Sequence, residues 1–185
     1  GKQLLTFERR RGDYLSLNEE MKLLRETKFL RRGVPLLYLG SYAGGPSGPA
    51  WTRAIRQHQQ ERGWPEFLFY VSDEPGSPER IEAAKKELAD FAGLEGIRTV
   101  TAGLDVEALG RLYDVWIQNV GMDQRTRRRA AQWRKELWAY DCVLHGATPQ
   151  HDRYLAGLYA WRWRLRGLFQ WAYTHFAERF VTQEG

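Results

Sequence analysis

Two adjacent carboxylates, Asp73 and Glu74, are the residues of this sequence best suited to acid–base chemistry. They follow the aromatic and β-branched run Phe67–Val71 and directly precede Pro75. Because proline cannot donate to a sheet ladder and restrains the residue before it to extended geometry, the pair should lie where a buried strand leaves its sheet. Two carboxylates in one cleft can divide the roles of acid and base when their environments differ. The same residues also suit a turn before a helix, so the motif alone leaves both interpretations open.

The composition allows a sizeable core and a basic surface. Hydrophobic residues make up 43% of the 185 residues, and eight Trp, nine Tyr and eight Phe are among them. Aromatic residues in such numbers either fill a core or line clefts that bind sugars or bases. The net charge of +5 permits an anionic partner, but the run at Arg127–Arg129 is typical of a solvated helix face. This disfavours nucleic-acid binding.

Cysteine and histidine usage predicts neither a disulfide framework nor a metal site. Cys142 is the one cysteine, so the chain can form no intramolecular disulfide and no zinc quartet. His145 and His151 follow a predicted strand, but their spacing matches no standard metal motif. No stretch approaches the roughly twenty apolar residues of a membrane span. We therefore expect no metal, no cofactor and no membrane span.

Strands and helices are predicted to alternate along the chain. Short apolar runs predict strands, and residues 135–142 could form a sixth strand or prolong the helix before them. The predicted strands are 35–42, 66–74, 97–102, 115–119 and 167–173. The predicted helices are 16–29, 50–62, 78–93, 105–112, 123–134 and 152–164. Their predicted N-caps are Ser16 in the first helix and Ser77, Asp105, Asp123 and Asp152 in the last four. Residues 1–15 and 177–185 are expected to be irregular or exposed parts of a single domain spanning 1–185.

This alternation favours an α/β fold with a parallel sheet. Strands separated by helices of ten to fifteen residues are typical of βαβ units. The glycines at Gly44 and Gly45 lack the spacing of a phosphate-binding loop, which counts against a nucleotide-binding doubly wound fold. We therefore expect a (β/α)₈ TIM-barrel-like fold, as a partial barrel of about six strands, whose site lies where the strands end.

Aromatic and amide side chains stand near the ends of the other predicted strands. These residues are Tyr42, Trp116, Asn119, Tyr140 and Trp171. Carboxylates ringed by Trp and Tyr at one face of a barrel are typical of a carbohydrate site, because aromatic rings stack on the C–H faces of sugars. The same aromatic residues could instead fill the barrel and its helix shell. As a set, they favour the carbohydrate site.

Three segments resemble the catalytic domain of glycoside hydrolase family 123. They are Tyr70–Pro75, Leu137–Tyr140, and Ala160–Trp163 together with Gly167–Trp171. The resemblance extends from about residue 30 to residue 175. It implies a (β/α)₈ barrel, a glycan or glycoconjugate substrate, and β-N-acetylgalactosaminidase activity. It also implies a retaining, substrate-assisted mechanism in which the 2-acetamido oxygen of the sugar is the nucleophile and no metal or cofactor takes part.

The resemblance assigns roles to the site residues. Glu74 would be the general acid/base, and Asp73 would orient the acetamido N–H and stabilise an oxazolinium-like intermediate. Tyr140 would hydrogen-bond the acetamido carbonyl oxygen. Trp116 and Trp171 would wall the site. Asn119 and Tyr42 complete the expected set of substrate-binding residues.

The resemblance also sets the register of the barrel. If Asp73 and Glu74 end the fourth strand, the predicted strands are numbers three to eight, and the first thirty residues leave no room for strands one and two. We expect the missing strands to come from a longer chain or from an oligomer partner. Two other readings stay open: a non-catalytic, glycan-binding barrel fragment, and a basic protein that binds nucleic acid or another anionic polymer through Arg125–Arg134.

Overall fold

Six parallel strands form one sheet in the part of the chain that the structure describes. The computed structural model describes residues 15–30, 33–38, 49–142 and 149–170. The strands are β1 (Leu36–Tyr38), β2 (Phe67–Asp73), β3 (Arg98–Ala102), β4 (Val115–Asn119), β5 (Glu136–Asp141) and β6 (Gly167–Gln170). They pair in chain order from β1 to β6, and every neighbouring pair is parallel. The predicted α/β fold with a parallel sheet is confirmed.

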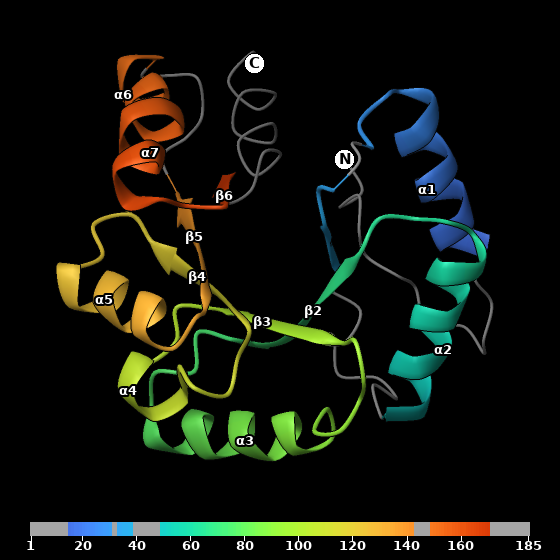
Figure 1. Cartoon of the computed structure of the whole chain (residues 1–185), viewed down its shortest axis with the longest axis horizontal. Helices are drawn as coiled ribbons and strands as arrows, with labels where there is room; N and C mark the ends of the chain where they lie inside the picture. The colour runs from blue at the N-terminus through green and yellow to red at the C-terminus, as the bar shows by residue number, and fades with distance from the viewer. Residues whose placement is uncertain (1–14, 31–32, 39–48, 143–148, 171–185) are drawn as a thin grey trace, which may run out of the picture.

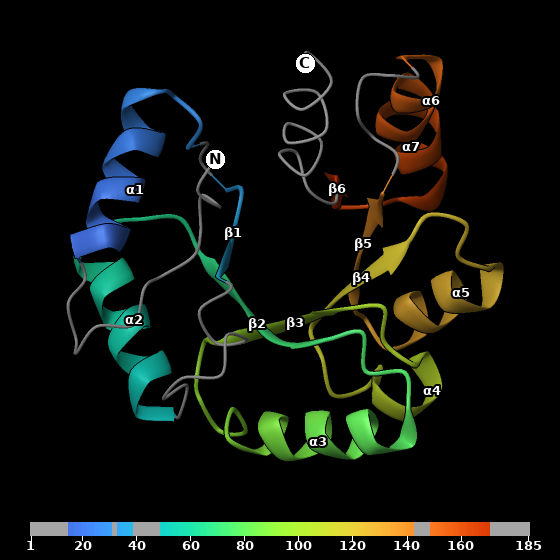
Figure 2. The same cartoon turned by 180° about the vertical axis from the view of Figure 1, so that it is seen from behind.

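Helices connect the strands and cover the outer side of the sheet. They are α1 (Leu15–Glu26), α2 (Pro49–Glu61), α3 (Pro78–Ala89), α4 (Val106–Leu109), α5 (Gln124–Gln132), α6 (Pro149–Tyr154), the π-helical turn η2 (Leu155–Tyr159) and α7 (Ala160–Trp163). Figure 1 shows the strands following an arc with the helices on its outer side. The view from behind shows β1 and β6 at the two ends of this arc (Figure 2).

Local sequence signals predicted most helix starts correctly. The side chains of Ser77, Asp105 and Asp123 each accept a hydrogen bond from a backbone N–H three residues on, which is the N-cap arrangement. The predicted caps at Ser16 and Asp152 are wrong, because both residues lie inside helices that begin earlier. The helix α1 already begins at Leu15, and α6 begins at Pro149 and continues through η2 into α7. Of the ambiguous residues 135–142, Glu136–Asp141 form β5, which pairs with strands on both sides.

The outer face of the sheet packs against the helices in two clusters. Leu17, Met21 and Leu24 form one buried face of α1, as their spacing predicts, and pack with Phe67 and Phe69 of β2. The second cluster, around α3, α4 and α5, is built on Tyr113 and Trp116, both 0% exposed. Burying side chains of this size stabilises the fold by roughly 1.5–3 kcal/mol each.

The inner face of the sheet is apolar in its middle and carries charged residues at the amino ends of the strands. The middle consists of Leu68, Tyr70, Val100, Val115, Ile117 and Trp138. At the strand starts, Arg98 pairs with Glu136 at 2.6 Å and with Glu66 at 3.4 Å. Burial alone would lower the pKa of Arg98, but its hydrogen bond to Glu136 and the nearby acidic charges raise it on balance. The inner face is therefore closed by an ion-pair network at the amino ends of the strands.

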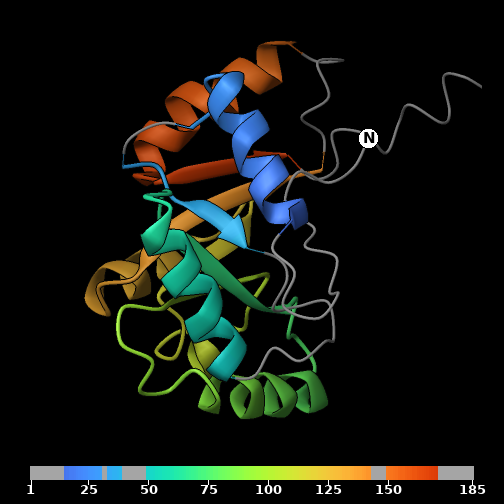
Figure 3. The same ribbon diagram turned by 90° about the vertical axis from the view of Figure 1, so that its right-hand side faces the viewer.

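The two edge strands, β1 and β6, each pair on one side only within the described residues. Figure 3 views the molecule from the side of α1 and α2, which lie in front of β1 and β2. Of the predicted strand 35–42, the structure describes Leu36–Tyr38 as β1, and residues 39–42 lie outside the described part. Among the described residues, no helix combines the length and apolar character needed to cross a membrane.

Candidate active site

A β-bulge near the end of β2 changes which side chains face inward. Tyr70 pairs with Val100 of β3, but the next paired residue, Ser72, is opposite Thr101. One residue of β2, Val71, is therefore extra. A one-residue insertion moves every following side chain to the other face of the sheet. Without the bulge, strict alternation would place Asp73 on the outer face together with Phe69.

The bulge brings Asp73 to the inner face of the sheet. Val71 packs into the outer cluster, and Ser72 Oγ shares a hydrogen bond of 2.6 Å with Tyr113 Oη on the same outer side. Asp73, half-buried, instead lies on the side of Tyr70, whose hydroxyl donates to Asp73 Oδ1 at 2.5 Å. The Tyr70 hydroxyl therefore fixes the position of the Asp73 carboxylate on the inner face.

The extended geometry predicted for Glu74, the residue before Pro75, is wrong: its backbone takes a left-handed conformation that turns the second carboxylate toward the same site. Its φ is 43°, a value that costs about 1–2 kcal/mol in a residue with a Cβ. Three hydrogen bonds hold this turn: the Glu74 N–H donates to Ala102 O at 3.0 Å, and the Glu74 carbonyl accepts from Gly76 N at 2.8 Å and from the Arg80 guanidinium at 3.1 Å. The exposed Glu74 side chain then reaches across the inner face to β5.

Tyr140 of β5 receives this carboxylate. Its hydroxyl donates to Glu74 Oε1 at 2.6 Å, and it also shares a side-chain hydrogen bond with Asn119 at the end of β4. Burial and the neighbouring Glu74 raise the pKa of Tyr140 to about 12, although the Asn119 contact acts in the opposite direction. Tyr140 therefore stays protonated at neutral pH and is available as a hydrogen-bond donor.

Tyr140→Phe should lower catalytic turnover by about 10- to 100-fold, because it removes the hydroxyl that donates a hydrogen bond to the Glu74 carboxylate. The matched control is Tyr113→Phe, which removes the hydroxyl bonded to Ser72 on the opposite face of the sheet. The control should lose about 1 kcal/mol of stability in urea unfolding and keep its turnover. Equal losses of turnover in the two variants would contradict a site role for Tyr140.

Gly103, directly after β3, leaves room for the Glu74 side chain. Its φ is 55°, in the region that favours glycine. A Cβ at this position would lie 2.9 Å from Glu74 Cγ and 3.4 Å from Glu74 Cβ. The first distance is too short for any real contact, so the flexible Glu74 side chain would have to move. Gly103 thus sets the position of the carboxylate indirectly.

Gly103→Ala should destabilise the protein by about 1–2 kcal/mol and also impair turnover by displacing Glu74 from Tyr140. Gly63→Ala is the matched control, since Gly63 has a φ of 62° but nothing within 4 Å of an added Cβ. It should show a similar stability loss in urea unfolding with unchanged turnover per folded molecule. If Gly103→Ala also retains full turnover, the steric role assigned to Gly103 is wrong.

The structure brings together four of the seven site residues predicted from the sequence. Asp73, Glu74, Tyr140 and Asn119 meet at the carboxyl ends of β2, β4 and β5. Tyr42 and Trp171 lie outside the described residues. The expectation for Trp116 is wrong, because its side chain is fully buried in the outer cluster.

Trp116 is held on the outer side of the sheet by close packing. Its indole N–H donates to Gly110 O at 3.0 Å, and its ring meets Trp133 edge-on with the ring centroids 5.9 Å apart. A Cβ at Gly110 would lie 2.7 Å from the Trp116 ring. Because side chains alternate along a strand, Trp116 and Asn119 of β4 face opposite sides, and Trp116 cannot wall a site on the inner face.

Sequence reasoning missed Tyr70 and Gly103 as site residues. Tyr70 precedes Asp73 by three positions, so strict alternation places the two on opposite faces, and only the bulge brings them together. For Gly103, a glycine directly after a predicted strand was the available signal. A further polar pair, His151 Nε2 and Asp141 Oδ2 at 2.8 Å, links α6 to the end of β5. Asp141 is buried and next to Tyr140, so this pair can help to fix that strand end.

In the described residues, no group of three or more His, Cys, Asp and Glu side chains is arranged to hold a metal ion. The groups described at the site are two carboxylates, two phenols and an amide, from Asp73, Glu74, Tyr70, Tyr140 and Asn119. Such a set can exchange protons and orient polar groups of a ligand, with the Glu74 side chain the more exposed of the two carboxylates.

Comparison with known families identifies a family for this chain. The family model described as glycoside hydrolase 123, catalytic domain, matches residues 49–184, which is more than half of the chain and includes β2 to β6. The matched range contains Tyr70, Asp73, Glu74, Asn119 and Tyr140. The comparison with curated proteins and the comparison with solved structures each return no match.

Proposed function

The chain belongs to the glycoside hydrolase 123 family, and from this premise we propose that it removes terminal β-linked N-acetylgalactosamine with retention of configuration, by substrate-assisted catalysis. The observation that supports the proposal is the convergence of Asp73, Glu74 and Tyr140 on the inner face of the sheet, at the carboxyl ends of the strands. Barrel enzymes place their chemistry at this edge.

Two carboxylates on consecutive residues fit the substrate-assisted mechanism better than the ordinary one. In an ordinary retaining glycosidase, the two carboxylates flank the scissile bond about 5–5.5 Å apart, and one attacks the anomeric carbon. A substrate that supplies its own acetamido nucleophile needs one carboxylate for proton transfer and a second group to orient the amide. Glu74 and Asp73, which differ in exposure and in partners, suit these two tasks.

Glu74 is the general acid/base in this proposal. In the first step its carboxyl proton passes to the glycosidic oxygen, the bond from that oxygen to the anomeric carbon breaks, and the acetamido oxygen bonds to the anomeric carbon. In the second step the Glu74 carboxylate takes a proton from water. That water attacks the anomeric carbon and breaks the bond to the acetamido oxygen, so the proton count balances over the cycle.

Asp73 and Tyr140 hold the acetamido group. Asp73 accepts the amide N–H, and its negative charge stabilises the cationic oxazolinium-like intermediate; Tyr70 fixes the carboxylate in place. Tyr140, which donates to Glu74 in the structure, turns its hydroxyl to the acetamido oxygen when substrate binds. That exchange frees Glu74 to carry the proton that the leaving oxygen needs.

We also propose that the sheet is the larger part of a (β/α)₈ barrel in which β1 to β6 are strands three to eight. The sequential parallel order, the outer helices and the arc in Figure 1 support this arrangement. Two further strands between β6 and β1 would close the barrel and cover the two edges that pair on one side only.

The activity is tested with three aryl β-glycosides: the N-acetylgalactosaminide, the N-acetylglucosaminide and the galactoside. We expect the first to be cleaved best, and the galactoside, which lacks the acetamido nucleophile, to resist cleavage. Proton NMR during turnover should show the β-anomer of the free sugar first. Release of the α-anomer, or equal cleavage of the galactoside, would contradict the substrate-assisted mechanism.

A further inference from the structure

An arginine-lined pocket lies at the amino ends of the strands, whereas the candidate active site lies at their carboxyl ends. Its volume is about 770 Å³, and its lining includes Arg127 of α5, Trp161 and Arg162 of α7, and Arg164 and Arg166 of the turn before β6. Because all strands run in the same direction, the turn that enters β6 lies at the amino ends of the strands, and the end of β2 that carries Asp73 lies at their carboxyl ends. The pocket is therefore separate from Asp73 and Glu74.

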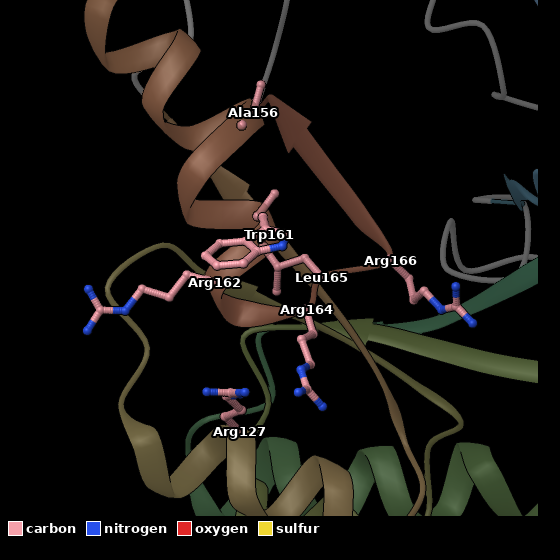
Figure 4. Close-up of a pocket in the computed structure, with 9 residues that line it drawn as sticks. Arg127, Ala156, Trp161, Arg162, Arg164, Leu165 and Arg166 are labelled. Atoms are coloured by element: carbon pink, nitrogen blue, oxygen red, sulfur yellow. The ribbon is translucent and has the colours of Figure 1, made fainter.

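The charges in this pocket have no counter-charge among the residues that the structure describes. Among the described residues, the guanidinium groups of Arg127, Arg162, Arg164 and Arg166 form no ion pair and no side-chain hydrogen bond. Figure 4 shows Arg162 and Arg166 extending to opposite sides of Trp161, with Arg164 and Arg127 below its indole. Four like charges without counter-charges repel one another and attract an anionic ligand.

The neighbouring arginines of α5 behave differently. Arg125 and Arg129 both pair with Glu107, at 2.8 Å and 2.9 Å. Arg127 and the exposed Arg128 have no such ion pair among the described residues, and of these two only Arg127 lines the pocket. A nucleic-acid strand needs a longer basic track with several stacking positions. An open pocket with this lining suits a short oligomeric ligand better.

Trp161 gives the pocket an aromatic surface. Its side chain is 76% exposed, the largest exposure among the described large hydrophobic residues. An exposed indole next to guanidinium groups offers a flat apolar face for the C–H side of a sugar ring, while the arginines offer forked donors for the oxygens of an acidic group. Guanidinium binds sulfate and carboxylate groups in the same bidentate way.

We propose that this pocket binds an acidic glycan, a saccharide bearing sulfate or carboxylate groups, at a site distinct from the catalytic one. The choice of a glycan among anionic ligands rests on the proposed glycosidase function. The pocket would bind an acidic stretch of a glycan chain while a terminal sugar of the same chain reaches Asp73 and Glu74 at the carboxyl ends of the strands.

The test is isothermal titration calorimetry with three hexasaccharides: a heparin fragment (sulfated), a hyaluronan fragment (carboxylated) and a neutral N-acetylglucosamine oligomer. We expect the acidic probes to bind and the neutral one not to bind. Binding should weaken between 50 and 200 mM salt. Arg127→Gln/Arg164→Gln should lower the affinity about tenfold and reduce the salt dependence, whereas Trp161→Ala should lower the affinity and leave the salt dependence unchanged.

Arg25→Gln/Arg62→Gln is the matched control, because it removes the same charge from exposed positions on α1 and after α2. It should bind the acidic probes within about twofold of the wild type. Equal binding of the neutral probe, equal loss in both double variants, or tighter binding of a single-stranded hexanucleotide would each overturn the proposal.

The experiment distinguishes a failure of the pocket proposal from a failure of the catalytic proposal. Glu74→Gln should bind the heparin fragment like the wild type, and the pocket variants should hydrolyse a small aryl glycoside like the wild type. Glycan binding without hydrolysis would therefore contradict only the catalytic assignment, and hydrolysis without glycan binding would contradict only the pocket.

Discussion

Glu74→Gln is expected to lower kcat/KM for a methylumbelliferyl N-acetylgalactosaminide by about 10²- to 10⁴-fold, the usual contribution of a general acid/base. The amide keeps the shape of the side chain but cannot give a proton to the leaving oxygen. With a dinitrophenyl glycoside the loss should be far smaller, because dinitrophenolate leaves without protonation. Measuring kcat/KM for both substrates isolates the acid role, since kcat/KM covers the steps up to the release of the aglycone.

Glu95→Gln is the matched control for this experiment, because Glu95 is an exposed carboxylate in the loop before β3, away from the site. Circular dichroism should show the same thermal unfolding for Glu74→Gln, Glu95→Gln and the wild type within the range of surface substitutions. Equal losses with the two aryl leaving groups would show that Glu74 does not act as the acid, even if the overall rate falls.

Asp73→Asn is expected to lower kcat/KM for acetamido substrates by about 10²- to 10³-fold, comparable to the loss of one electrostatic group at a developing charge. The carboxylate both accepts the amide N–H and balances the positive charge of the oxazolinium-like intermediate; an asparagine cannot supply that charge. A thiazoline that imitates this intermediate should inhibit the wild type and bind much more weakly to Asp73→Asn. Inhibition constants for the two proteins provide the measurement.

Asp114→Asn serves as the control for Asp73→Asn. Asp114 accepts hydrogen bonds from the backbone N–H and the hydroxyl of Thr99 at the amino end of the sheet, opposite the site. This variant should lose stability in urea unfolding and keep its affinity for the thiazoline. An unchanged thiazoline inhibition constant in Asp73→Asn would instead rule out contact between Asp73 and the acetamido group.

Much of the secondary structure around the site can be predicted from short stretches of sequence. The strand at Val115–Asn119 has the predicted bounds, and the caps at Ser77, Asp105 and Asp123 start helices as expected. These features depend on residues within three or four positions of one another, so propensity and capping chemistry suffice to predict them. Asp152 shows the limit of this reasoning, because a residue typical of caps lies inside a longer helix that starts at Pro149.

Family membership could also be predicted from sequence, and so could the position of the two carboxylates at a strand end. The segments Tyr70–Pro75 and Leu137–Tyr140 were sufficient to suggest the family that the comparison then matched over residues 49–184. The faces of the strands were harder to predict. Trp116 and Asn119 both looked available for binding, yet the period of two along β4 places one in the outer core and the other beside Tyr140.

By itself, then, the sequence determined the parallel α/β framework, the family, and the placement of Asp73 and Glu74 where β2 ends. Only the tertiary structure decided how the two carboxylates reach one site: a bulge returns Asp73 to Tyr70, and a left-handed turn beside Gly103 sends Glu74 to Tyr140. Both depend on the pairing of β2 with β3 and on the position of β5. Tyr140 lies 66 residues beyond Glu74, and no local pattern encodes a contact over that separation.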